Sequence, residues 1–154
     1  MDVLVVGLGN GLRGDDGAGL EVARRAEPRL RSVADVIAHP GEPVDLIEAW
    51  RGYDAVVLVD AARTLGRAGF LRRYEYGRDR FPSGDLGTSS HAFDLLVAIE
   101  LADAMGALPR KLVLYAVEGE RFALGDEPSD AVLRALDTAV ERVCADVQEW
   151  VPKR

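Results

Sequence analysis

Three short runs of the chain are apolar at successive positions rather than at alternate ones, and they are rich in β-branched residues. Continuous apolar runs of this length are typical of strands buried on both faces, as in a parallel sheet covered by helices. A weaker pattern predicts one more strand, and an alternating pattern predicts an edge strand. The three runs are Val3 to Val6, Ala55 to Val59 and Leu112 to Val117; the other two strands are Val33 to Ala38 and Phe70 to Tyr76.

Helical patterns lie between these strands. The first helix begins near Asp15 or Asp16 and runs to about Glu27, where Pro28 is expected to end it. Ser129 is the predicted N-cap of the last helix, whose apolar residues recur at spacings of three and four. Alternating strands and helices predict one α/β domain over residues 1–154 with a mostly parallel sheet of about five strands. The stripe of the last helix is Leu133, Leu136, Val140, Val143, Val147 and Trp150, and the two middle helices are Pro43 to Trp50 and Ser90 or His91 to Gly106.

The composition is that of a globular protein and excludes several classes of function. Of 154 residues, 48% are hydrophobic, and 19 basic against 26 acidic residues give a formal charge of −7. This charge argues against binding to nucleic acid or to a membrane surface. No membrane span or secretory signal is recognisable, so a cytoplasmic location is expected. The single cysteine, Cys144, excludes an internal disulfide and is expected to be packed and inert.

Residues 7–19 form a glycine-rich segment with the sequence GLGNGLRGDDGAG, directly after the first strand. A dinucleotide site begins in the same way, but the third glycine of its fingerprint is replaced by Leu12. Asp15 and Asp16 would also repel a pyrophosphate at the start of the helix. The segment is better suited to a cation, with Asp15 expected to cap the helix and Asp16 to face the crevice.

Two further residues are expected at the same end of the sheet. Asp60 closes the third strand, where α/β sheets place ligands, although a helix cap or turn is an equally good interpretation for a single aspartate. His91 opens the helix that leads into the strand at Leu112. This helix should therefore begin at the end of the sheet that carries Asp16 and Asp60. Two carboxylates and a neutral imidazole would suit Ni²⁺, Zn²⁺, Mn²⁺ or Fe²⁺.

Other catalytic arrangements fit the sequence poorly. Ser89 and Ser90 adjoin His91, but neighbours at a helix start do not normally face each other, and no nucleophile elbow is present. The only cysteine lies in the last helix, which argues against a cysteine protease. His39 follows the second strand and could support the site or face the substrate.

Taken together, the glycine-rich segment, Val59-Asp60-Ala61, Ser90-His91 and the segment KLVLYAVEGE at 111–120 resemble the hydrogenase maturation proteases over nearly the whole chain. The resemblance implies a twisted, largely parallel sheet between helices. It also implies an endopeptidase, often classed as aspartic-type, that removes a carboxyl-terminal extension from the large-subunit precursor of a nickel-iron hydrogenase after nickel insertion. The sequence departs from the family in residues 38–43, where AHPGEP replaces an acid or cysteine followed by Gly-Gly-Thr.

The resemblance also implies roles for individual residues. Asp16, Asp60 and His91 match the family's ligands for nickel carried by the substrate, although other divalent ions could occupy the same site. Asp16 and Asp60 are the candidate catalytic residues, either of them as the base, and the candidate substrate contacts are Gly9, Asn10, His39 and Glu118. A factor that docks on a metallated precursor without cutting it would use the same ligands, and a nucleotide-binding domain remains a third interpretation.

Overall fold

The computed structural model describes residues 1–63, 66–81 and 89–152, without the side chains of 89–94. Within these residues, five strands form one sheet in the order β2-β1-β3-β5-β4. The first four of these are parallel, and β4 runs antiparallel to β5 at the edge of the sheet. The predicted α/β fold is therefore confirmed, including the edge strand. The strands are β1 (Val3–Leu8), β2 (Asp35–His39), β3 (Ala55–Arg63), β4 (Leu71–Glu75) and β5 (Lys111–Gly119).

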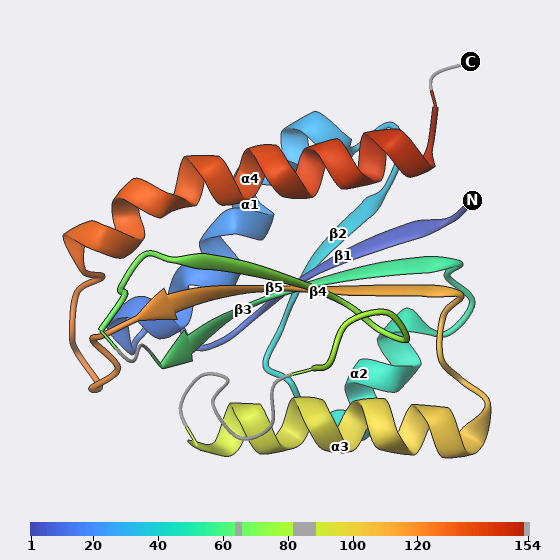
Figure 1. Ribbon diagram of the computed structural model, residues 1–154, viewed down its shortest axis with the longest axis horizontal. Coiled ribbons are helices and arrows are strands. Elements are labelled where there is room, and N and C mark those ends of the chain that lie inside the picture. Colours follow the sequence, from blue (N-terminus) through green and yellow to red (C-terminus); the bar gives the residue numbers. More distant parts are fainter. Residues whose placement is uncertain (64–65, 82–88, 153–154) are drawn as a thin grey trace.

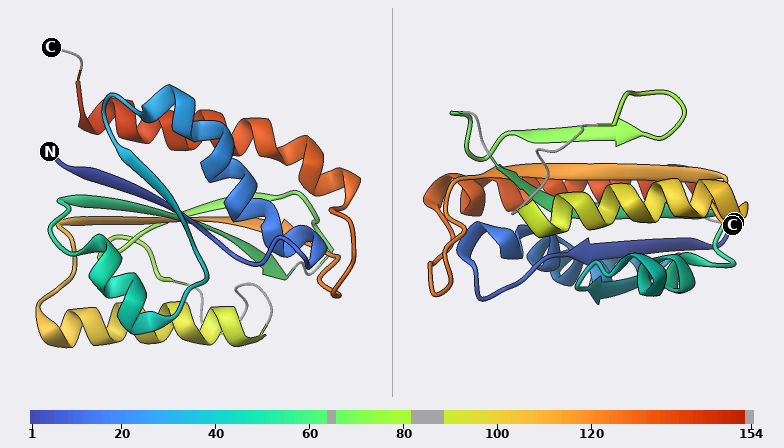
Figure 2. Two further views of the ribbon diagram at one scale, coloured as in Figure 1. Left: turned by 180° about the vertical axis from the view of Figure 1, so that it is seen from behind. Right: turned by 90° about the horizontal axis from the view of Figure 1, so that it is seen from below.

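Helices cover both faces of the sheet in two layers. Helices α1 (Ala18–Leu30) and α4 (Asp130–Trp150) lie on one face, and α2 (Pro43–Trp50) and α3 (Ser89–Met105) lie on the other (Figures 1 and 2). Each face has its own cluster of buried apolar side chains. On β3, Val57 and Val59 join the α1/α4 cluster, whereas Val56 and Leu58 join the α2/α3 cluster. Because side chains alternate along a strand, Asp60 points to the α2/α3 face.

The first helix differs from its prediction at both ends. A 3₁₀ turn, η1 (Gly14–Gly17), precedes α1, which therefore begins later than Asp15 or Asp16. At the other end, α1 includes Pro28 and continues to Leu30. Pro28 is exposed, and Leu30 is fully buried in the core, so packing of the last residue extends the helix past the proline.

The last helix begins where the sequence predicts. Ser129 is its N-cap, and the Ser129 hydroxyl accepts a hydrogen bond from the backbone N–H of Val132 at 3.4 Å. The predicted stripe is wrong at its first position, because Leu133 is 45% exposed and Val132 is buried in its place. Cys144 lies on the buried side of this helix, and burial raises the pKa of its thiol, in agreement with an inert packed side chain. No helix in the described ranges is both long and apolar enough to cross a membrane.

Candidate functional site

The loop between β1 and α1 folds tightly against its own aspartate. Gly9 has a φ of +137°, and a Cβ built there would lie 2.0 Å from the carbonyl oxygen of Asp16, so only glycine fits. The backbone N–H of Asn10 donates to Oδ2 of Asp16 at 3.0 Å. Oδ1 of Asn10 in turn accepts from the N–H of Leu12 at 2.9 Å. The loop therefore holds the buried Asp16 carboxylate in place.

Asp15 does not cap its helix, so that prediction is wrong. Its buried carboxylate instead accepts hydrogen bonds from the segment between β5 and α4. Oδ2 accepts from the N–H groups of Glu120 and Arg121 at 2.8 and 3.0 Å and from the Ser129 hydroxyl at 2.9 Å. Oδ1 accepts from the N–H of Ser129 at 2.7 Å. Asp15 thus ties the glycine-rich loop to the start of α4.

Asp60 lies inside β3 rather than at its end, because the strand continues to Arg63. It is therefore neither a helix cap nor a turn residue. The side chain is 1% exposed, and Oδ1 accepts from the N–H of Ala61 at 2.8 Å. Oδ2 has no hydrogen-bond partner within the described ranges. Burial raises the pKa of the Asp60 carboxyl to about 8, although the Ala61 bond lowers it and the charge of Asp16 raises it further.

The structure brings Asp16 and Asp60 together from two elements. The turn η1, which carries Asp16, packs against β3, which carries Asp60, and the charge of Asp16 raises the pKa of the Asp60 carboxyl. Helix α3 begins at this same carboxyl end of the sheet, because it leads into β5, which is parallel to β3 (Figure 1). His91 lies in the first turn of α3, and its side chain is outside the described part of the chain.

Two carboxylates are fewer ligands than a metal site usually has. Structural and catalytic metal sites commonly use three or more protein ligands. Among the side chains that the structure describes, no three His, Cys, Asp or Glu residues are grouped to hold a metal ion. The remaining ligand of the predicted set is His91, which stays a prediction.

Two other candidate residues, His39 and Glu118, also lie at the carboxyl end of the sheet. His39 ends β2, and its Nδ1 accepts from the N–H of Gly41 at 2.9 Å, so a neutral imidazole carries its proton on Nε2. Glu118 is buried near the end of β5. Its Oε2 lies 3.7 Å from Nη2 of Arg67 and 3.9 Å from Nε of Arg72.

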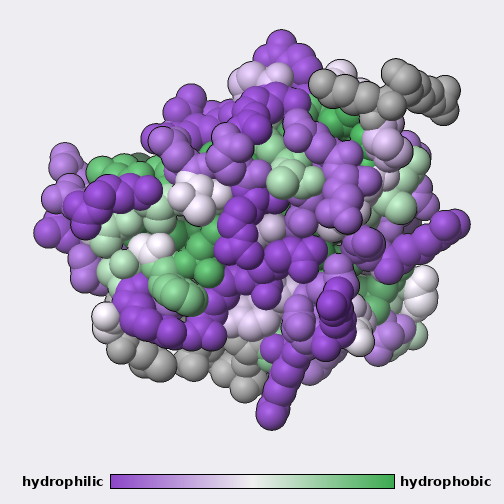
Figure 3. All heavy atoms as spheres, turned by 45° about the horizontal axis from the view of Figure 1, so that its top comes forward, coloured by the Kyte–Doolittle hydropathy of each residue, from purple (hydrophilic) through white to green (hydrophobic). Residues whose placement is uncertain are grey.

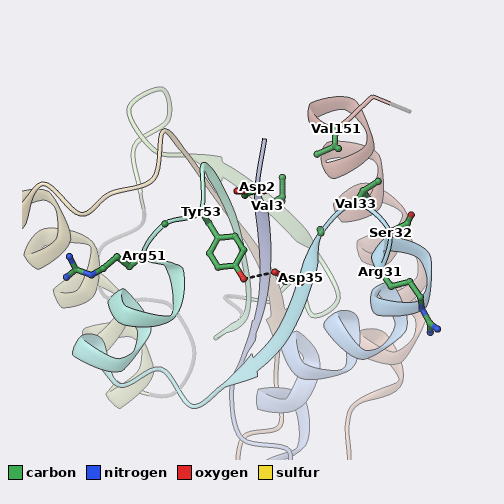
Figure 4. A pocket seen from close by; sticks show the side chains of 11 residues that line it. Asp2, Val3, Arg31, Ser32, Val33, Asp35, Arg51, Tyr53 and Val151 are labelled. Carbon is green, nitrogen blue, oxygen red and sulfur yellow. Dashed lines mark hydrogen bonds between the residues drawn. The ribbon is translucent and has the colours of Figure 1, made fainter. Parts of the chain in front are cut away.

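Neither Asp16 nor Asp60 lines the two cavities that follow, both of which are formed by residues that the structure describes. One of about 580 Å³ opens at the amino ends of β1 and β2, and its lining includes Asp2, Asp35 and Tyr53 (Figure 4). Within it, the Tyr53 hydroxyl donates to Oδ2 of Asp35 at 2.6 Å. A smaller groove of about 290 Å³ lies between α1 and the start of α4. Figure 3 shows a mostly hydrophilic face, with apolar atoms gathered toward the end at which α4 begins.

Comparison with known proteins identifies the family. The sequence model of a family described as hydrogenase maturation protease matches residues 24–146. This chain belongs to the hydrogenase maturation protease family. It is therefore a peptidase with a role in hydrogenase maturation, as the resemblance of its motifs implied. A search of the curated proteins returned no significant match.

Solved structures of hydrogenase maturation proteases share the fold. The [NiFe] hydrogenase maturation protease HybD from Thermococcus kodakarensis is 24% identical with a TM-score of 0.78, covering 96% of this chain and 99% of its own. The hydrogenase maturating endopeptidase HybD from E. coli is 20% identical with a TM-score of 0.78, covering 98% of this chain and 94% of its own. At this level of identity, the similarity establishes the arrangement of strands and helices.

The role of Asp15 beside the site could not be predicted from the sequence. Asp15 carries four hydrogen bonds that join the glycine-rich loop to α4. Its partners are 105 to 114 positions away along the chain, so no local pattern could reveal them. The short Asp15-Asp16 motif suggested two carboxylates at one helix start, whereas the tertiary structure gives each a different set of partners.

Proposed function

We propose that this peptidase removes a carboxyl-terminal extension from the large-subunit precursor of a nickel-iron hydrogenase after nickel has been inserted. In this proposal, Asp16, Asp60 and His91 contact the nickel that the precursor carries. The metal then acts as the recognition element, because a precursor without nickel offers these three side chains nothing to bind. Nickel is thus part of the substrate.

The observation that carries the proposal is the pair of buried carboxyl groups, Asp16 and Asp60, at the carboxyl end of a parallel sheet. Two acids from separate elements are costly to bury together unless a cation or a shared proton compensates them. Helix α3 starts at the same end and carries His91 in its first turn. Family membership supplies the reaction class, and this pair of carboxyl groups supports the proposed location of the reaction.

Asp60 is suited to proton transfer as well as to metal contact. With a pKa of about 8, its carboxyl group carries a proton near neutral pH. Oδ2 is the atom placed to give up that proton, because Oδ1 already accepts from Ala61. Approach of the nickel that the precursor carries favours the ionised form of this carboxyl group, so Oδ2 gives up its proton to solvent as the metal binds. Either ionised carboxylate, Asp60 or Asp16, can then accept a proton from an attacking water.

The test is a mass measurement of nickel-loaded and nickel-free precursor before and after incubation with the protein. We expect loss of the extension from the nickel-loaded precursor alone. Asp16→Asn, Asp60→Asn and His91→Gln should each abolish cleavage. Retained cleavage in all three variants would overturn the assignment of the site.

The control is Asp137→Asn, which removes an exposed carboxylate on α4 that pairs with Arg25. It should leave cleavage unchanged and so separates an effect at the site from a general effect of charge. Nickel-dependent binding with no change in precursor mass would instead support a docking factor that does not cut.

A further inference from the structure

The register of the sheet places an arginine in the same row as Asp60, that is, among the residues that lie opposite one another on neighbouring strands. Asp60 on β3 is opposite Ala116 on β5, and Ala116 is opposite Arg72 on β4. Neighbouring strands are about 4.8 Å apart, so the backbones of Asp60 and Arg72 are roughly 10 Å apart. Ala116 packs in the α2/α3 cluster, and residues in one row of a sheet share a face. Arg72 therefore lies on the α2/α3 face in the same row as Asp60, with Ala116 between them in the register.

The next residue of β5 on that face is Glu118, which brings a second arginine to the same place. Its Oε2 lies 3.7 and 3.9 Å from the guanidinium groups of Arg67 and Arg72 and accepts no hydrogen bond within the described ranges. Backbone hydrogen bonds also join the segment before β4 to β5: the N–H of Gly69 donates to the Glu118 carbonyl at 2.6 Å. The N–H of Glu118 donates to the Phe70 carbonyl at 2.9 Å. Glu118 thus orients both arginines through its charge while their segment is held by the backbone.

The ring of Phe70 holds both guanidinium groups on the surface. The guanidinium carbons of Arg67 and Arg72 lie 4.6 and 5.5 Å from the ring centroid, within the range of cation–π contact. The side chains remain 49% and 40% exposed. Two exposed guanidinium groups thus lie together against the buried Glu118 carboxylate, in a chain whose formal charge is −7.

We propose that Arg67 and Arg72 form a subsite that binds a carboxylate of the precursor's carboxyl-terminal segment, next to Asp60. The planar fork of arginine matches a carboxylate, and charge-assisted hydrogen bonds of this kind are strong. The identity of the ligand rests on the proposed function. The carboxylate comes either from the chain terminus of the segment or from one of its acidic side chains.

The alternative role for the two arginines is purely structural: their contacts with Glu118 and Phe70 would hold β4 against β5. In that case, substitution of either arginine would change the stability of the protein without any preference for a negatively charged ligand. A comparison of matched charged and uncharged ligands therefore separates the two roles.

The test follows the Nε–Hε NMR signals of the arginines in the full chain during titration with three acetylated tripeptides. The first is alanine tripeptide with a free terminal carboxylate, the second is its terminal amide, and the third is an amide with a central glutamate. We expect saturable shifts of the Arg67 and Arg72 signals with one or both acidic peptides and none with the uncharged amide. A response to the first or to the third identifies the source of the carboxylate.

Substitution then tests the assignment to these two residues. Arg67→Gln and Arg72→Gln should each weaken binding about tenfold, since a lost charge-assisted contact is worth at least about 1.4 kcal/mol. Arg78→Gln, at the far end of β4, is the matched control and should bind as the parent does. Equal binding of acidic and uncharged peptides, or no binding at millimolar peptide, would overturn the subsite. A failure of precursor cleavage alone would leave this result standing and count against the proposed function instead.

Discussion

At the scale of single residues, the two adjacent aspartates of the glycine-rich loop do different work. Asp16 is held by Asn10 within its own loop and interacts with Asp60 on β3. Asp15 faces away and accepts four hydrogen bonds from Glu120, Arg121 and Ser129. One carboxylate therefore belongs to the candidate site, and its neighbour holds together the loops around that site.

Asp15→Asn should destabilise the protein by about 2 to 3 kcal/mol, because whichever way the amide is turned its NH₂ group faces at least one backbone N–H that needs an acceptor. The measurement is urea unfolding at neutral pH. Asp137→Asn is the control and should change the unfolding free energy by less than about 1 kcal/mol, since its carboxylate is exposed and salt-bridged only at the surface. If both variants lower the free energy of unfolding by the same amount, Asp15 does not hold the glycine-rich loop to the start of α4.

The raised pKa of Asp60 predicts a pH dependence of stability. Its carboxyl titrates near 8 in the folded protein against an ordinary value of 3.8, so the folded state binds the extra proton between these limits. This proton therefore adds to the free energy of unfolding. Its contribution is complete below pH 3.8 and is lost as the pH rises toward 8, by at most about 1.4 kcal/mol per pH unit.

Asp60→Asn cannot titrate and should flatten this part of the curve. Urea unfolding from about pH 5 to about pH 9 measures the effect. We expect the variant to be more stable than the parent at the alkaline end and the difference to shrink in acid. Parallel curves for the two proteins would show that Asp60 does not titrate in this range.

At the scale of elements, close contact between α1 and the sheet depends on the absence of side chains. A Cβ built at Gly19 would lie 2.1 Å from the carbonyl oxygen of Val59 and 2.6 Å from that of Leu8. Both neighbours are backbone atoms of strands and cannot move aside. The helix can start at this place only because its first turn carries glycine.

Gly19→Ala should therefore push α1 off the sheet and destabilise the protein by about 3 kcal/mol or more. Gly11→Ala is the matched control, because the nearest atom to a Cβ there is Cδ1 of Leu20 at 3.9 Å. It should stay within about 0.5 kcal/mol of the parent. Thermal unfolding compares the two, and tolerance of alanine at position 19 would contradict the contact with β3.

At the scale of the whole molecule, the two ends of the sheet differ in chemistry. The carboxyl end gathers Asp16, Asp60 and the start of α3, whereas the amino end carries the cavity beside Tyr53 and Asp35 (Figure 4). In open α/β sheets, ligands bind at the carboxyl ends of the strands. We therefore propose the carboxyl end, where the acids lie, as the functional end of this molecule.

Tyr53→Phe removes the hydrogen bond to Asp35 in the cavity at the amino end. It should leave the rate of precursor cleavage unchanged, because this cavity lies at the other end of the strands from Asp60. Cleavage is followed by the mass of the nickel-loaded precursor. If the cleavage rate of Tyr53→Phe falls as far as that of Asp60→Asn, the active site does not lie at the carboxyl end of the sheet alone, and this prediction is wrong.

The sequence by itself determined the layers and the order of the elements. Continuous apolar runs predicted β1, β3 and β5, and the alternating run predicted β4 as an edge strand. Ser129 marked the start of α4 because N-capping is a local interaction. The motifs of the glycine-rich loop, Asp60 and His91 indicated the family, which the match over residues 24–146 establishes.

Only the tertiary structure decided how distant segments meet. Asp15 was expected to cap its own helix, yet its partners lie more than 100 positions away, and local pattern contains no information about them. Pro28 stays within α1 because burial of Leu30 outweighs a local signal to stop. Arg72 lies in the row of Asp60 because register is set between strands, not along one. Contacts within a few residues can be predicted from sequence, whereas pairings across the sheet depend on packing of the whole chain.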